Sequence, residues 1–216
     1  MIPYTARPIK SSDGKAFIRE HHYTHGCHNG PMTFGLFDGD SLIGVCAFAT
    51  PSSENVRASV FGPEHKAAVT ELHRLVILDC TPTNTESWFI SRALRWVSEY
   101  KPALRGILSF ADATEGHRGT IYQATNALYC GTTSRTRFWR DQDGRLRHPR
   151  QNGVNITPAM AAERGWVAES RAAKYRYLFL VGDKGDRKWA KRNLRLTPEP
   201  YPPADPAEEI QLQEAA

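Results

Sequence analysis

The sequence predicts an α/β or α+β fold in which strands and helices alternate within one domain. Short apolar runs rich in β-branched and aromatic residues alternate with longer segments whose apolar residues recur at helical spacing. The chain has 216 residues, of which 40% are hydrophobic and 24% charged. This composition is that of a globular protein with a substantial core.

A short helix and a hairpin are expected first. Ser12 and Asp13 are suited to the N-cap of a helix over 15–22. The apolar runs 33–37 and 42–49 are separated by Asp-Gly-Asp. An Asp-Gly turn between two such runs predicts a β-hairpin.

A central strand and a longer helix follow. Residues 69–78 alternate at first and then become continuously apolar, as an interior strand does. A helix is expected to begin near Thr85 and to end before Pro102, with an inward apolar stripe. The run GILSFA over 106–111 predicts a short buried strand.

Shorter signals define the C-terminal half. We expect a helix over 119–126, a strand over 128–130 and a last strand over 174–181. Between them, residues 132–165 are rich in Arg, Asn and Gly, which predicts a basic insertion.

We therefore expect a domain over 1–195 that includes this insertion. Residues 196–216 are rich in proline and acidic residues, which predicts a disordered tail.

The net charge of +5 is distributed unevenly along the chain. Residues 1–114 carry 11 basic and 11 acidic side chains, and residues 115–197 carry 17 basic and 7 acidic ones. Residues 198–216 carry five acids and no base. A strongly basic portion favours a polyanionic partner such as nucleic acid, and a solvated Arg-rich face is the alternative.

Several classes of protein are disfavoured. No apolar run approaches the roughly 18–20 residues of a membrane span, and the N-terminus lacks the apolar core of a signal peptide. The four cysteines lie far apart without a CxxC pair, which is typical of free thiols in a reducing compartment. We expect no membrane partner and a cytoplasmic location.

A histidine-rich segment is the first candidate site. Four of the eight histidines lie within 21–28, together with a cysteine. Imidazole and thiolate bind zinc or iron, but the segment lacks the paired spacing of a structural zinc site. The alternative is the wall of a substrate site, with His22 and Tyr23 facing the substrate.

Charged residues interrupt the predicted central strand. Strand periodicity places Glu71 and His73 on one face, and Leu72 and Arg74 on the other. Charges inside an apolar strand are unfavourable unless they are paired or lie at a cleft. A strand-end ion pair and a ligand site are both compatible with this pattern.

The segment from Ser109 to Gly131 is the third candidate and the densest in polar residues. A buried strand delivers Ser109 and Asp112 to its carboxyl end, where open α/β sheets bind ligands. Gly116 and Gly119 permit close backbone approach before a helix whose N-terminus favours an anion, although a helix-capping turn would also need glycines. The other candidate residues of this segment are His117, Tyr122, Gln123, Asn126 and Tyr129, and we expect Tyr122 and Asn126 to share a helix face.

At these residues the sequence resembles the Mom family of phage DNA-modification proteins. The matching pieces are His22-Tyr23, E-L-x-R-L from Glu71 to Leu75, and S-F-A-D-x-x-x-G-H-x-G-x-I-Y-Q-A-x-N-x-x-Y-x-G from Ser109 to Gly131. The resemblance covers about 10–181. It implies a fold similar to the GNAT acyltransferases, with a mixed central sheet flanked by helices. It also implies addition of a carbamoylmethyl (acetamido) group to the exocyclic N6 amine of adenine in DNA, which protects phage DNA from restriction in the host cytoplasm.

The resemblance assigns expected roles to individual residues. An amine inside a duplex is inaccessible, so we expect double-stranded DNA with a flipped adenine as the substrate. Asp112 is the first candidate for the base, followed by His117 and Glu71. The complete catalytic set also includes His22, Tyr23 and Ser109, and the substrate-binding set is Arg74, Tyr122, Gln123, Asn126, Tyr129, Gly116 and Gly119. The expected DNA-binding residues are Arg118, Arg135, Arg137, Arg140, Arg187, Lys188, Lys191 and Arg192.

The sequence specifies the donor and the metal less closely than it specifies the site residues. The connection 79–85 contains no glycine, unlike the pyrophosphate loop of acetyltransferases, so an acyl or aminoacyl donor, small or carrier-bound, is expected with acetyl-CoA as one option. The resemblance also implies iron, for which His22 and Tyr23 are the candidate ligands. Two other functions fit the sequence: a GNAT-like N-acyltransferase acting on a protein or small-molecule amine, and a non-catalytic DNA-binding protein.

Overall fold

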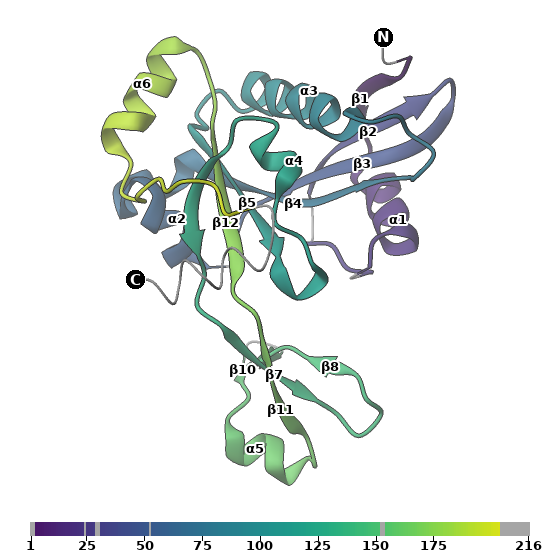
Figure 1. Ribbon diagram of the computed structural model, residues 1–216, viewed down its shortest axis with the longest axis vertical. Helices are drawn as coiled ribbons and strands as arrows, with labels where there is room; N and C mark the ends of the chain where they lie inside the picture. Colours follow the sequence, from purple (N-terminus) through teal and green to yellow (C-terminus); the bar gives the residue numbers. More distant parts are fainter. Residues whose placement is uncertain (1–2, 24, 29–30, 52, 152–153, 204–216) are drawn as a thin grey trace.

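A single seven-stranded sheet forms the body of the protein (Figure 1). The computed structural model describes residues 3–23, 25–28, 31–51, 53–151 and 154–203. The strands of the body are β1 (Thr5–Ile9), β2 (Met32–Asp38), β3 (Ser41–Ala49), β4 (Val69–Ile77), β5 (Gly106–Asp112), β6 (Leu128–Thr132) and β12 (Lys174–Leu180). Their order is β1-β2-β3-β4-β5-β12-β6, and all neighbours are antiparallel except β4 and β5, which are parallel.

Helices cover both faces of this sheet. They are α1 (Ser11–His21), α2 (Glu54–Phe61), α3 (Thr85–Tyr100), α4 (Thr120–Gln123) and α6 (Lys184–Asn193), with the short 3-10 turns η1 (Pro63–Ala68) and η2 (Ala113–Glu115). Val45 of β3 packs with Ile18 of α1, whereas its neighbour Cys46 packs with Phe89 of α3, because successive strand residues point to opposite faces. Among the described residues, no helix is long and apolar enough to cross a bilayer.

The predicted fold class, a mixed sheet flanked by helices, is confirmed. The Asp-Gly hairpin is present, with Gly39 at φ +56° between β2 and β3. The interior strand, the helix from Thr85 and the two buried strands are also present as β4, α3, β5 and β12. No clear pattern predicts β1, α2 or α6, which are short or mostly polar.

The helix predicted over 119–126 is wrong in its length. α4 spans only Thr120–Gln123, because Asn126 takes a left-handed backbone at φ +59° and the chain turns into β6. Tyr122 and Asn126 therefore do not share a helix face.

β4 and β5 are joined along only part of their length. Their register pairs Val69 with Gly106, Thr70 with Ile107 and Glu71 with Leu108, and pairing stops there. β4 continues to Ile77 beside β3, and β5 continues beside β12, so the two ribbons separate (Figure 1). The separation opens a gap in the middle of the sheet.

A bulge in β4 changes the predicted facing of its charged residues. Phe48 of β3 pairs with Leu72, and the next residue, Ala47, pairs with Arg74, so His73 is the extra residue. A bulge of this kind breaks the two-residue alternation of the strand. Glu71 and Arg74, predicted on opposite faces, consequently both reach the gap between β4 and β5.

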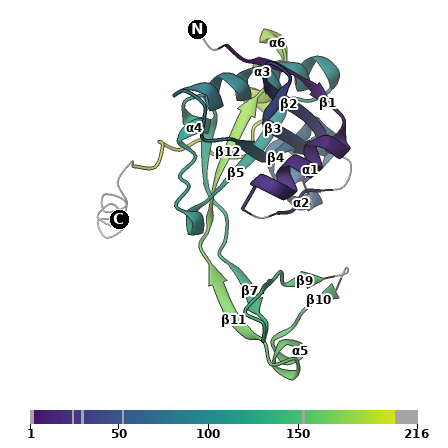
Figure 2. The same ribbon diagram turned by 90° about the vertical axis from the view of Figure 1, so that its right-hand side faces the viewer.

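A small lobe extends from the body at the ends of β6 and β12 (Figures 1 and 2). It contains β7 (Thr136–Arg140), β8 (Leu146–Arg147), β9 (Arg150–Gln151), β10 (Val154–Asn155), α5 (Pro158–Glu163) and β11 (Val167–Arg171). β11, β7 and β8 form a three-stranded sheet, and Trp139, Ile156 and Ala161 form a separate apolar cluster. The basic segment predicted over 132–165 falls mainly on this lobe.

The first part of the predicted disordered tail lies against the body instead. The amide of Glu199 donates to the carbonyl of Tyr129, and the hydroxyl of Tyr201 donates to the carbonyl of Ala127. Arg118 donates to the carbonyl of Pro203 at 2.6 Å. Proline fixes φ and reduces the conformational entropy lost on binding, so this proline-rich segment is ordered by few contacts. Residues 204–216 lie outside the described residues.

Two glycines before α4 provide a matched test of this packing. Gly116 and Gly119 have φ of +73° and +76°, but only at Gly119 would a Cβ collide, at 2.3 Å from the buried ring of Tyr177. Gly116→Ala is expected to lower the free energy of unfolding by about 1–2 kcal/mol through backbone strain alone. Gly119→Ala should lower it by roughly 3 kcal/mol or more, because overpacking adds to the same strain. Urea denaturation measures both, and equal losses would contradict this packing.

Candidate active site

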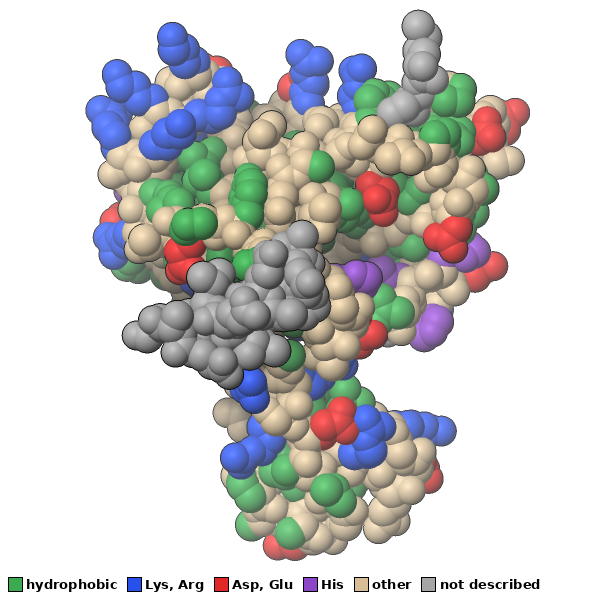
Figure 3. All heavy atoms as spheres, in the orientation of Figure 1, with side chains coloured by type: hydrophobic (Ala, Val, Ile, Leu, Met, Phe, Trp, Pro, Cys, Tyr) green, Lys and Arg blue, Asp and Glu red, His purple; other side chains and the backbone are tan. Residues whose placement is uncertain are grey.

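A cavity of about 810 Å³ occupies the gap between β4 and β5. Its walls come from the end of α1, the bulged part of β4, the end of β5, the turn before α4 and the root of the lobe. Histidine side chains gather on the part of the body that faces the lobe (Figure 3). The polar and aromatic residues that line the cavity are His21, His22, Tyr23, His28, Glu71, His73, Arg74, Glu86, Phe110, Asp112, His117, Arg118, Thr120, Tyr122, His148 and Lys174.

Asp112 lies at the end of β5 and is held by cations. Its Oδ2 is 3.3 Å from Nζ of Lys174 and 3.9 Å from the guanidinium of Arg171, and its Oδ1 accepts the amide of Thr114. Burial alone would raise the pKa of Asp112, but Lys174, the Thr114 amide and Arg171 together bring it below its ordinary value. The carboxylate is therefore ionised and is a weak acceptor of protons at neutral pH.

The turn that follows Asp112 contacts the lobe at the point where the lobe joins the body. The guanidinium of Arg171, at the end of β11, donates to Glu115 at 2.6 Å. The amide of Ala172 donates to the hydroxyl of Thr114 at 3.3 Å. These contacts connect the lobe directly to the turn that carries Asp112.

Three rings form a row along one wall. The rings of His22 and Tyr23 stack with centroids 4.4 Å apart, and Tyr23 lies 6.1 Å from His117. Burial, reinforced by the positive charge of Arg74, lowers the pKa of His22 to about 4, so it is neutral at pH 7. Tyr23 is 48% exposed and presents a ring on which a planar base can stack.

The rings of His22 and Tyr23, the candidate ligands of the iron that the resemblance implies, stack with centroids 4.4 Å apart. Within the described ranges, no group of three or more His, Cys, Asp or Glu side chains is placed to hold a metal ion. We therefore assign no step to a metal.

Arg74 connects β4 to the segment after α1. Its Nε donates to the carbonyl of Gly26 at 2.9 Å, and its Nη1 donates to the carbonyl of His73 at 2.7 Å. Burial lowers its pKa, but an arginine remains charged at neutral pH. A fixed positive charge therefore faces the cavity beside Glu71.

Ser109 does not line the cavity, contrary to the expectation that it acts there directly. Its side chain is fully buried, and its hydroxyl donates to the carbonyl of Leu72 at 3.4 Å. This bond bridges β5 and β4 where their pairing ends. Tyr122 does line the cavity, and burial raises its pKa to about 12, so its phenol stays neutral.

Three predicted substrate-binding residues lie outside the cavity. Gln123 donates to the hydroxyl of Tyr177 at 2.9 Å, and Tyr129 is buried in the core against the rings of Tyr175 and Tyr177. Asn126 lines a second hollow, between α3 and α6. Tyr177 of β12 holds Gln123 and Tyr129, and Asn126 follows α4 with a left-handed backbone.

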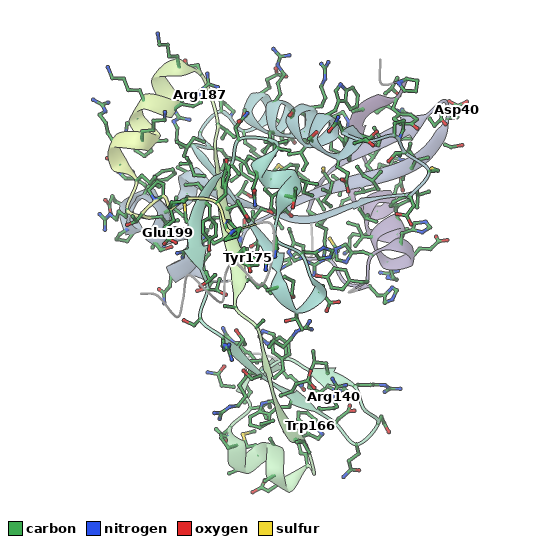
Figure 4. The ribbon with its side chains drawn as sticks, viewed as in Figure 1. Asp40, Arg140, Trp166, Tyr175, Arg187 and Glu199 are labelled. Atoms are coloured by element: carbon green, nitrogen blue, oxygen red, sulfur yellow. The ribbon has the colours of Figure 1, made fainter. Side chains whose placement is uncertain are left out.

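The predicted DNA-binding residues fall into separate groups. Arg118 lines the cavity, and Arg135, Arg137 and Arg140 lie on the lobe, where Arg140 donates to Glu169 at 2.6 Å. The remaining residues, Arg187, Lys188, Lys191 and Arg192, lie on α6. Figure 4 shows Arg140 and Arg187 at opposite ends of the molecule.

Sequence reasoning missed Lys174 and His148, which line the cavity, and Arg171 beside it. Lys174 begins β12, and the pairing of β12 with β5 places it directly opposite Asp112. His28 and His73, which lay in the candidate segments, line the cavity edge to face with ring centroids 3.8 Å apart. The antiparallel register of β12 with β5 is the one signal that would have identified Lys174.

The connection between β4 and α3 offers little to a pyrophosphate. The amide and hydroxyl of Thr85 both donate to the carbonyl of Pro82, so neither is available to a phosphate. Glu86, in the first turn of α3, lines the cavity and would repel a phosphate.

Two solved structures to which the chain is similar are acetyltransferases. An acetyltransferase of the GNAT family from Streptococcus pneumoniae has a TM-score of 0.47 at 12% identity, over 83% of this chain and 99% of that one. Spermidine/spermine N-acetyltransferase SpeG from Vibrio cholerae has a TM-score of 0.47 at 14% identity, over 88% and 96%.

A curated relative and a family profile match most of the chain. The methylcarbamoylase mom of Escherichia phage Mu is 24% identical over 196 residues, which are 87% of this chain and 79% of that protein. The profile of the Mom protein family matches residues 3–203. The matched range contains the motif residues that meet in the cavity, and the chain belongs to the Mom protein family.

Proposed function

We propose that this chain is a DNA-modifying transferase that adds a carbamoylmethyl group to the N6 amine of adenine. Its membership of the Mom family supports this activity. The observation that carries the assignment to a site is that Glu71, Arg74, Asp112 and His117, from separate segments, line one cavity. In a phage or prophage setting, the modified DNA would escape restriction in the cytoplasm of the bacterial host.

The cavity suits an adenine that has left the duplex. Its volume of about 810 Å³ falls within the range of ligand pockets and is large enough for a base and a small donor. Tyr23 offers an exposed ring for stacking, and the neutral Tyr122 phenol can hydrogen-bond the base edge. The ionised Asp112 is placed to accept a hydrogen bond from an amine rather than to remove its proton.

The donor is an activated carbamoylmethyl or aminoacyl compound in this proposal. Arg74 places a fixed charge where it can polarise a donor carbonyl or bind a carboxylate. Glu86 and the occupied donors of Thr85 disfavour a pyrophosphate at α3, and therefore disfavour acetyl-CoA in the usual position.

The duplex is proposed to run along the mouth of the cavity and the lobe. Arg118, His148 and Lys174 border the cavity on the side of the lobe, which carries Arg135 and Arg137 on exposed positions. α6 lies at the other end of the body, so one duplex lying across the lobe does not need its cations.

Expression in bacteria tests the reaction. Plasmid DNA is expected to contain a deoxyadenosine heavier by one carbamoylmethyl group, measured by mass spectrometry of its nucleosides. Asp112→Asn should reduce this product by about 100-fold, because it removes the charge that Lys174 and Arg171 position.

Unmodified adenine from well-expressed, folded wild-type protein would reject the proposed activity. Tight duplex binding without product would favour the non-catalytic DNA-binding alternative. Modification of a protein or small-molecule amine instead would favour the acyltransferase alternative.

Two double charge reversals locate the DNA path. Arg135→Glu with Arg137→Glu on the lobe is expected to weaken duplex binding and to reduce the salt slope of log K by about 2, one for each lost phosphate contact. Lys188→Glu with Arg192→Glu on α6 changes the same number of charges and should leave that slope nearly unchanged. Fluorescence anisotropy across a salt series measures both, and the reverse ranking would place DNA on α6.

A further inference from the structure

His73 is a buried cavity residue to which the proposed reaction has so far given no role. Its side chain is 8% exposed, and its Nδ1 lies 3.5 Å from Oε1 of Glu71. Its other ring nitrogen, Nε2, is buried and has no hydrogen-bond partner among the described residues. Both residues line the cavity.

The contacts of Nδ1 bear on which nitrogen carries the proton. Nδ1 lies 3.5 Å from Oε1 of Glu71, a carboxylate oxygen that accepts, and 3.5 Å from Nη1 of Arg74, which donates and already bonds the carbonyl of His73 at 2.7 Å. We take the tautomer with the hydrogen on Nδ1, directed at Glu71. Nε2 of the neutral ring then bears a lone pair. A buried acceptor without a donor is unfavourable, and in a ligand cavity this points to a donor supplied by the ligand.

The other candidates for the base are less suitable by their surroundings. Asp112 is held by Lys174 and Arg171, which stabilise its ionised form and weaken it as a base. His22 is stacked on Tyr23, and burial and nearby cations keep its basicity low. His73 alone combines a carboxylate on one nitrogen with an unpartnered acceptor on the other, among the described residues of the cavity.

We infer that His73 is the proton acceptor of the modification reaction, with Glu71 as the residue that positions it. This inference rests on the proposed function. In the step, the N6 amine attacks the carbon of the activated carbamoylmethyl donor. The N6–C bond forms, the bond from that carbon to its leaving group breaks with its electron pair, and the N6 proton passes to Nε2 of His73.

The groups around His73 define what must happen before the step. Glu71 and Arg74 face it from β4, His28 packs edge to face against it, and His22 lies nearby at the end of α1. Nε2 is closed off from solvent in this structure, so the proposed step requires neighbouring side chains to move before substrate contacts it. Burial lowers the pKa of His73 and Glu71 opposes this, leaving a net decrease and a neutral ring at pH 7.

Removing the imidazole of His73 and supplying free imidazole in solution test whether His73 accepts the proton. His73→Ala is expected to lower the single-turnover rate by about 100-fold or more, as loss of a general base does. Added imidazole should restore part of the rate, an effect that a merely structural role would not produce. His65→Ala is the matched control, because His65 packs against Trp189 outside the cavity, and it should react normally with no response to imidazole.

The pH profile and the ring tautomer test the role of Glu71. The wild-type rate should fall on the acid side, below the ordinary histidine pKa of about 6.5. Glu71→Gln removes the interaction that favours the imidazolium, so the acid limb should move to lower pH and the rate should drop. Nitrogen-15 NMR of the free protein should show His73 protonated on Nδ1 and bare on Nε2.

The outcomes separate this inference from the proposed function. If the wild type is active and the His73→Ala variant is equally active, His73 is not the proton acceptor. Loss of activity in His73→Ala that imidazole does not restore overturns the role as well. A protonated Nε2 also overturns it. An inactive, folded wild type rejects the proposed function itself.

Discussion

The separation of β4 from β5 after three paired residues is the constraint on which the rest of the structure depends. Two parallel strands that part inside a sheet leave facing backbone edges without their usual partners. The bulge at His73 and the bond from Ser109 to Leu72 accommodate the fork. The gap is therefore lined by polar groups held on rigid strands, which is the arrangement that a site for chemistry requires.

The lobe and the cavity are linked by charge rather than by apolar packing. Arg171, at the root of the lobe, bridges Glu115 and approaches Asp112, while Lys174 completes the pair at the start of β12. The carboxylate at the end of β5 is thus neutralised by residues whose positions depend on the lobe. In the proposed reaction, the lobe that binds DNA and the Asp112 carboxylate that contacts adenine are therefore connected through the same ion pairs.

Local signals predicted much of the fold and part of the site. The hairpin at Gly39, the interior strand and the helix from Thr85 follow from turn chemistry and apolar periodicity. The motifs identified His22, Arg74 and Asp112, which do line the cavity, although their roles remain predictions. The short strands of the lobe were missed, because two-residue ladders leave no periodic pattern.

The sequence by itself determined which residue types are available and which family they belong to. Tertiary structure alone decided that Lys174 stands opposite Asp112, because strand register depends on partners distant in the chain. It also placed Gln123 and Tyr129 outside the site, since Gln123 bonds the hydroxyl of Tyr177 and Tyr129 packs in the core. One extra residue in β4 brought Glu71 and Arg74 to the same gap, and a bulge is defined only by the pairing of two strands, which no single segment contains.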